Sequence, residues 1–299
     1  MTDLRVLVGY SPDERGDDAL ALACLVARTA KAKLTVANVH PPAWPARGPG
    51  SVDAEWVAYL KEQAEAALEQ AKERMSGAKV PKKDVEFVVH ANRGSGRGLL
   101  EVAKDIGAGL IVVGSAPRGR RDRIAIGSTA DQLLHGSPVP VLMAPRSWAE
   151  DTPKKFDRLT VAYWRRPAGE RALTAAAEFA GSLGLPVRLV TLVLRPPGIA
   201  AKFRNADGVM ERQFAQAERD LAHAAKIVGE STEVNTEAVG GAGIAKTLGT
   251  VDMLAGEVLA VMSSHDGPLR KVFLGESSGK IVRAASCPVL VLPRGTTGH

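Results

Sequence analysis

The chain alternates short apolar runs with longer runs in which apolar residues recur at helical spacing. In the first half we expect strands at Arg5–Val8, Lys33–Val39, Val85–His90, Gly109–Val113 and Val139–Met143, and helices at Asp17–Lys31, Asp53–Met75, Gly98–Ile106 and Ser128–His135. Strands that are apolar throughout, without polar alternation, indicate burial on both faces of a parallel sheet. Because parallel strands need crossover connections, the pattern predicts an α/β fold with helices on both faces.

The second half of the chain repeats this plan. Its expected strands lie near Leu159–Ala162, Pro186–Leu194, Val234–Ala238, Val258–Met262 and Val289–Leu292, and its expected helices near Gly169–Leu183, Asn205–Val228, Ile244–Leu254 and Ser277–Ala285. The closing segments match at an offset of 148 positions: Pro140–Arg146 reads PVLMAPR and Pro288–Arg294 reads PVLVLPR. Self-similarity of this kind indicates a repeat.

We therefore predict two tandem Rossmann-like domains, residues 1–146 and 157–294, each with a five-stranded parallel sheet. The polar segment Ser147–Phe156 is the expected linker. Both closing strands, Val139–Met143 and Val289–Leu292, are apolar and carry no charge. Because an apolar edge strand invites pairing, we expect the two domains to pair through these strands as an intramolecular pseudo-dimer.

Composition narrows the class of protein. With 45% hydrophobic and 24% charged residues, the 299-residue chain has the profile of a soluble globular protein. No targeting segment and no apolar run of membrane-spanning length is visible, and the two isolated cysteines, Cys24 and Cys287, suit a reducing compartment. These features predict a cytoplasmic protein with no membrane partner. The net charge of +6 leaves open a plain basic surface, a phosphate ligand or a nucleic-acid face.

Candidate chemistry lies after the fourth strand of the first half. Gly114 and Gly119 flank a loop that contains Arg118, and Gly127, Ser128 and Thr129 open the next helix. Glycines let backbone N–H groups approach an anion, and a helix start supplies unpaired N–H groups with a partial positive charge. Ligands of open parallel sheets bind beyond the carboxyl ends of the strands, so this segment predicts a phosphate cradle.

The segment Gly114-Ser115, Gly119, Gly127-Ser128, followed by a helix and Pro-Val-Pro-Val-Leu, resembles the signature of the universal stress protein family. In ATP-binding members of that family the signature reads G-x2-G-x9-G-[ST]. Gly114 and Gly127 keep the spacing of thirteen, whereas Pro117 stands where the family has its inner glycine. Proline has no N–H to offer a phosphate. The Asp that ATP-binding relatives carry just after the first strand is replaced by Ser11 in the first half and Trp164 in the second.

The resemblance implies a stress-response protein whose first domain binds ATP or a related adenine nucleotide. The site residues that it implies are Gly9, Ser11, Val39, Gly114, Arg118, Gly119, Gly127, Ser128 and Thr129. The second domain has Glu276 in the Ser/Thr position, where a carboxylate would repel phosphate, so we expect it to be degenerate and structural.

Other interpretations stay open at this stage. Pro117 and the missing Asp also suit a nucleotide-free, stress-induced scaffold that recruits an unknown protein partner. An ATP-consuming α/β enzyme is a third class, but no nucleophile–base pair supports a catalytic centre, and no His or Cys spacing supports a metal site. The basic segment Arg118–Arg123 suits a phosphate or a solvated loop; without interleaved aromatic residues it argues against nucleic acid.

Three further features are a glycine-rich segment, two tryptophans and two histidines. We expect the segment Gly94–Gly98 to be a flexible turn, and Trp44 and Trp56 to be core or cover residues, with a partner surface as the alternative. His40 and His90 fall at the ends of strands, on the side where a ligand would bind.

Overall fold

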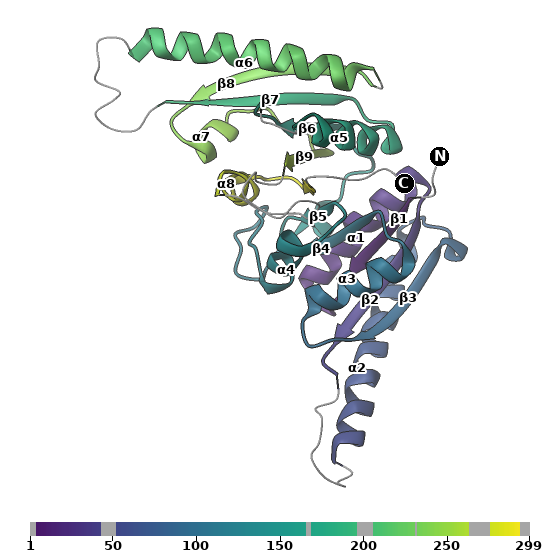
Figure 1. Cartoon of the computed structure of the whole chain (residues 1–299). Coiled ribbons are helices and arrows are strands. Elements are labelled where there is room, and N and C mark those ends of the chain that lie inside the picture. Colours follow the sequence, from purple (N-terminus) through teal and green to yellow (C-terminus); the bar gives the residue numbers. More distant parts are fainter. Residues whose placement is uncertain are drawn as a thin grey trace. The chain divides into compact units, whose positions relative to one another are not determined.

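The computed structural model describes residues 4–42, 52–165, 169–195, 206–230, 232–262 and 276–293 (Figure 1). The chain divides into two compact units, Met1–Thr152 and Pro153–His299. Trp44 and the whole segment between Met262 and Glu276 lie outside the described residues.

The first unit is a parallel sheet whose strands come in the order β3-β2-β1-β4-β5. Its strands are β1 (Arg5–Gly9), β2 (Lys33–His40), β3 (Val85–Ala91), β4 (Leu110–Gly114) and β5 (Val141–Ala144). Its helices are α1 (Glu14–Ala30), α2 (Val52–Arg74), α3 (Ser95–Ile106) and α4 (Ser128–Gly136), with 3-10 turns at Met75–Gly77, Lys82–Asp84 and Trp148–Asp151. The predicted fold class, α/β with a parallel sheet, is confirmed.

The crossover direction reverses within this sheet. The chain steps outward from β1 to β3 and then returns to the other side of β1 for β4 and β5. Because each crossover is right-handed, the reversal puts α1 and α2 on one face and α3 and α4 on the other. In keeping with this, α1 contacts α2, and α3 packs against α4 (Figure 1). The reversal leaves a crevice at the carboxyl ends of β1 and β4, where α/β proteins bind ligands.

The sequence explains where α1 begins and what holds the end of the unit. Asp13 caps the helix by accepting hydrogen bonds from the backbone N–H groups of Arg15 and Gly16. Asp18, which is 2% exposed, accepts from the backbone N–H groups of Ser147 at 2.9 Å and Ala149 at 2.8 Å. The predicted linker therefore starts with an ordered turn that is fixed to α1.

The second unit has the same topology, with strand order β10-β9-β6-β7-β8. Its strands are β6 (Arg158–Ala162), β7 (Val187–Leu194), β8 (Val234–Gly241), β9 (Glu257–Met262) and β10 (Val289–Leu292), and its helices are α5 (Gly169–Leu183), α6 (Ala206–Gly229), α7 (Ile244–Leu248) and α8 (Glu276–Ala284). The expected helix Ile244–Leu254 is shorter than predicted: α7 ends at Leu248, since Gly249 follows and the backbone N–H of Leu254 turns to donate to Glu257.

Membrane insertion finds no support in these helices. Within the described ranges, none of them combines the length and the hydropathy that a transmembrane span requires. The pairing of the two closing strands, Val139–Met143 and Val289–Leu292, stays a prediction.

Candidate functional site

A cavity of about 340 Å³ lies at the carboxyl edge of the first unit, at the point where the strand order reverses. It is lined from the ends of β1, β2 and β4 and from the first turns of α1, α3 and α4. The lining residues are Gly9, Tyr10, Ser11, Arg15, Gly16, Ala37, Asn38, Val39, Ser95, Leu99, Val113, Gly114, Ser128 and Thr129. The volume falls in the range of small-molecule sites.

The structure brings most of the predicted site residues together. Those that line the cavity are Gly9, Ser11, Val39, Gly114, Ser128 and Thr129. Gly127 is the N-cap of α4 and directly precedes Ser128. Arg118 and Gly119 do not line the cavity. Arg118 is exposed, and the Gly119 N–H donates to the Ala116 carbonyl at 3.1 Å, so that N–H is already engaged.

The turn after β1 closes one side of the cavity. Asp13 Oδ1 accepts from the Ser11 hydroxyl at 2.9 Å and from the backbone N–H groups of Arg15 and Gly16 at 3.0 and 3.1 Å. Its Oδ2 accepts from Arg15 Nε at 3.1 Å and Nη2 at 2.5 Å. Burial raises the pKa of Asp13, but these hydrogen bonds outweigh burial and hold that pKa below its usual value. Asp13 is thus a helix cap and an ion-pair partner, and it does not line the cavity.

Two glycines are required by close backbone approach at this edge. A Cβ on Gly114 would lie 2.1 Å from the Arg15 carbonyl oxygen, and one on Gly16 would lie 1.8 Å from the Ser11 carbonyl oxygen. These distances leave no room for any side chain. The end of β4 and the first turn of α1 are therefore in direct backbone contact, and this contact fixes the position of Arg15.

The N-termini of α3 and α4 meet at the opposite side of the cavity. The Ser95 and Thr129 hydroxyls are 2.5 Å apart, and a Cβ on Gly96 would lie 2.8 Å from the Thr129 carbonyl oxygen. The segment Gly94–Gly98, expected to be a flexible turn, instead caps and begins α3, and its glycines allow the two helices to approach. The sequence analysis did not select Ser95, although this residue lies shortly after the end of β3 and is the first residue of α3.

The loop between β4 and α4 folds back on itself. The Ala125 backbone N–H donates to the Ser115 hydroxyl at 2.8 Å, and the Ala116 N–H donates to the Ala125 carbonyl at 2.8 Å. Arg146 donates to the Gly119 carbonyl at 2.9 Å. These bonds bring Gly127 and Ser128 back beside Ala116, and none of them needs an N–H at Pro117. A Cβ on Gly127 would meet only Ala116.

The histidines at the strand ends do not reach the cavity. His40 Nδ1 lies 2.8 Å from the Pro41 carbonyl, and His90 Nε2 lies 2.7 Å from a Glu101 carboxylate oxygen. Among the described residues, no group of three or more His, Cys, Asp or Glu side chains is arranged to hold a metal ion.

The second unit differs at the equivalent edge. When the strand pairings of the two units are aligned, Leu159 of β6 corresponds to Val6 of β1. In this alignment Ala162 occupies the position of Gly9, and the buried Met262 occupies the position of Gly114. A cavity of about 360 Å³ in this unit is lined instead by Trp164, Arg165, the end of β7 and one side of α6.

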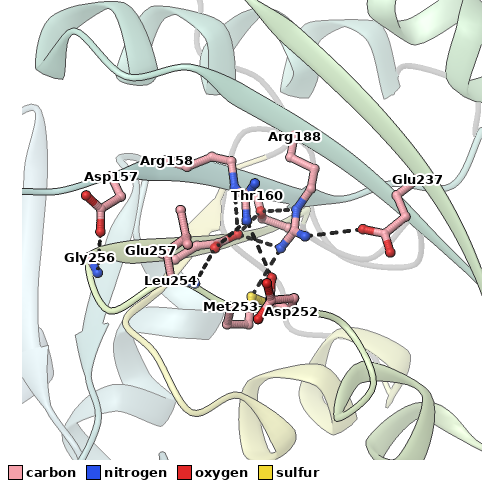
Figure 2. A network of polar contacts seen from close by, with 10 residues as sticks. All are labelled: Asp157, Arg158, Thr160, Arg188, Glu237, Asp252, Met253, Leu254, Gly256 and Glu257. Atoms are coloured by element: carbon pink, nitrogen blue, oxygen red, sulfur yellow. Dashed lines mark hydrogen bonds and ion pairs between the residues drawn. The ribbon is translucent and has the colours of Figure 1, made fainter.

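At the opposite edge of the second unit, a buried ion-pair cluster joins the beginnings of three strands. Glu257 of β9 is fully buried, and its carboxylate accepts from Arg188 Nη2 at 2.7 Å, from Arg158 Nη2 at 2.8 Å and from the Thr160 hydroxyl (Figure 2). The Leu254 backbone N–H donates to the same carboxylate at 2.8 Å. Burial raises the pKa of Glu257, but these partners outweigh burial and lower it overall.

Fold and site together define a class: tandem doubly wound α/β units, one of which has a cavity at its topological switch point, where proteins of this architecture bind ligands. A profile of the universal stress protein family matches residues 4–145 and again residues 155–293. The chain therefore belongs to the universal stress protein family, in its two-domain form.

Relatives support this assignment over the full length. Universal stress proteins of Mycobacterium tuberculosis and Mycobacterium bovis are 36% identical over 296 residues, which cover 97% of this chain and 100% of theirs. A solved universal stress protein from Archaeoglobus fulgidus superposes with a TM-score of 0.69 at 18% identity, covering 99% of this chain and 100% of its own. A putative one from Pseudomonas aeruginosa gives 0.57 at 17% identity, with 98% and 94% covered. At these sequence identities, the two solved structures show that the fold is shared.

Proposed function

We propose that this stress-response protein binds ATP or a related adenine nucleotide in the cavity of its first unit. The observation that carries the proposal is the convergence of Gly114, Ser128 and Thr129 with the ends of β1 and β2 around one cavity at the switch point. Backbone N–H groups at the start of α4 and the hydroxyls of Ser128 and Thr129 suit phosphate oxygens. Val39 and Leu99 supply the apolar surface that a heterocyclic base needs.

The second unit has a structural role in this proposal. Met262 puts a buried side chain at the position of Gly114, so the backbone approach that shapes the first cavity is not available there. Glu276 at the start of α8 is exposed and would repel phosphate.

The first test is the nucleotide content of the purified full-length protein, followed by calorimetric titration with ATP. Gly127→Val is the informative variant, because a Cβ there meets only Ala116, at 3.1 Å, and the backbone conformation of Gly127 is one that any residue adopts. We expect Gly127→Val to lose ATP binding and keep its fold. Gly181→Val, at an exposed position of α5 where a Cβ meets nothing within 4 Å, is the matched control. Unchanged ATP affinity in Gly127→Val would overturn the site.

A second candidate function is the nucleotide-free scaffold that recruits a protein partner. The observation in its favour is an exposed aromatic pair on α2: Trp56 and Tyr59 stack with ring centroids 5.5 Å apart while 54% and 49% exposed. Trp56 is therefore neither a core nor a cover residue, contrary to expectation. Tryptophan and tyrosine are the residues most enriched at protein interfaces. A partner captured equally well after nucleotide is stripped, and lost in Trp56→Ala, would favour this function.

A further inference from the structure

We propose that Arg15 is the phosphate-binding cation of the first-unit cavity, and that the site takes its nucleotide without a divalent metal ion. This inference rests on the proposed function and adds the form of ligand that the site accepts. It assigns a role to a residue that lies outside the glycine and hydroxyl pattern of the sequence signature.

The charge of the cavity lining points to an anion. Among the lining residues within the described ranges, Arg15 is the one with a charged side chain; the other polar groups come from hydroxyl, amide and backbone groups, among them Ser11, Asn38 and Ser128. Among the residues that the structure describes, no Asp, Glu, His or Cys lines the cavity. Magnesium and calcium are held in proteins mainly through carboxylates. A described lining that includes one arginine and no carboxylate therefore suits a phosphate by itself better than a metal-bound phosphate.

The pairing of Arg15 allows it to change partner at little cost. Its guanidinium contacts Asp13 Oδ2, and the two side chains are 46% and 38% exposed. An exposed ion pair typically favours the paired state by about fivefold or less. Arginine presents two parallel N–H groups that match two phosphate oxygens, so a phosphate in the cavity competes well with the carboxylate.

The rest of the turn stays in place when the guanidinium moves. Asp13 is held through its other oxygen, Oδ1, by Ser11 and two backbone N–H groups. The backbone of Arg15 is held against Gly114 by the close approach of its carbonyl oxygen. Only the side chain of Arg15 needs to turn. Opposite it, the paired N-termini of α3 and α4 supply partial positive charge, which complements a phosphate but does not neutralise it.

The experiment is calorimetric titration of the full-length protein with ATP in EDTA and in excess MgCl2, repeated for Arg15→Gln. Adenosine, which has no phosphate, is the ligand control. Arg212→Gln, which removes the same charge from an exposed position of α6 in the second unit, is the protein control. We expect equal or tighter ATP binding in EDTA, and a loss of about 10- to 100-fold in Arg15→Gln, the range for a charge-assisted hydrogen bond. Adenosine affinity should not change.

The outcomes separate this inference from the proposed function. If the wild-type protein binds neither ATP nor adenosine, the proposed function fails and this inference fails with it. If ATP binds but EDTA abolishes binding, the function stands and the metal-free form of the ligand is overturned. If Arg15→Gln binds ATP as wild type does, the function stands and the role of Arg15 is overturned. Should Arg15→Gln unfold, Arg15→Lys replaces it: this variant keeps the charge but loses the bidentate geometry, so ATP affinity should still fall while adenosine affinity holds.

Discussion

Removal of the Glu257 charge should destabilise the second unit strongly. Glu257→Gln keeps the shape of the side chain but deprives Arg188, which is 6% exposed, of its buried anionic partner. Arg188 retains Thr160 at 2.9 Å and the half-exposed Glu237 at 3.2 Å, which compensate only in part. Breaking a buried ion pair from one side costs about 3–5 kcal/mol. For a unit of this size that corresponds to a melting temperature lower by roughly 6–20 °C.

The assay must report on the second unit by itself, because a two-unit protein need not unfold in one step. Amide hydrogen exchange followed by mass spectrometry meets this need, with peptides from β6 and β9 as reporters and peptides from β1 and β4 as internal controls. Exchange should accelerate in the second unit of Glu257→Gln and stay unchanged in the first. A change in unfolding free energy below about 1 kcal/mol would refute the reasoning, because the arginines would then be solvated.

The chain itself supplies the matched control. The strand registers make Thr160, Arg188 and Glu257 equivalent to Leu7, Thr35 and Gly109 of the first unit. The triple variant Thr160→Leu, Arg188→Thr, Glu257→Gly removes the buried Arg188–Glu257 pair together with its desolvation cost, and it leaves Arg158, whose side chain is 20% exposed, able to reach water. Removal of one partner of a buried ion pair leaves an uncompensated charge, whereas removal of both partners does not. We therefore expect the triple variant to be more stable than the single Glu257→Gln variant.

The pH dependence follows from the sign of the pKa shift. The pKa of Glu257 is lower in the folded protein than its ordinary value of 4.5. A carboxylate of this kind contributes stability that is fully present above its unfolded pKa and is lost as pH falls through its folded pKa. The difference between wild type and Glu257→Gln should therefore be constant near neutral pH and shrink below about pH 4.5.

Two further predictions concern the first unit and the thiols. Gly114→Ala should destabilise the first unit by more than about 2 kcal/mol, because its Cβ would lie 2.1 Å from the Arg15 carbonyl oxygen. Thermal unfolding of this variant, measured beside Gly127→Val, tests the prediction, since Gly127→Val should remain near wild type. Equal stabilities of the two variants would contradict it. Cys24 and Cys287 should resist thiol reagents in the native protein, since burial raises the pKa of each to about 12; rapid labelling at pH 8 without denaturant would show that these sites open.

The sequence predicted most of the fold because the apolar strand runs are continuous and are separated by turns. It predicted the cavity in outline, since Gly114 and Ser128 follow a strand and begin a helix. It could not predict the end of α7, because Gly249 and the bond from Leu254 to Glu257 override helical periodicity. Arg188, a lone charge inside the apolar run Pro186–Leu194, was the available signal for the buried cluster, but its partner is far along the chain.

The sequence did not indicate that Arg15 lies at the cavity, for a related reason. Its side chain follows a helix cap and has ordinary helical sequence neighbours, so only the three-dimensional contact with Gly114 places it at the cavity. The contact depends on the absence of a Cβ at one residue and on the backbone path of another. Hydrophobic periodicity shows which face of a helix or strand is buried. It does not show where two backbone segments come into close contact.

The two units have sheets of the same strand order but differ at both edges of those sheets. At the carboxyl edge the first unit has glycines where the second has Ala162 and Met262, and close backbone approach there is the condition for the first cavity. At the amino edge the second unit has the Arg188–Glu257 pair where the first has Thr35 and Gly109. A fully partnered buried ion pair fixes strand register but offers no group to a ligand. The substitutions at the two edges therefore favour the same division of roles, with ligand chemistry in the first unit and structure in the second.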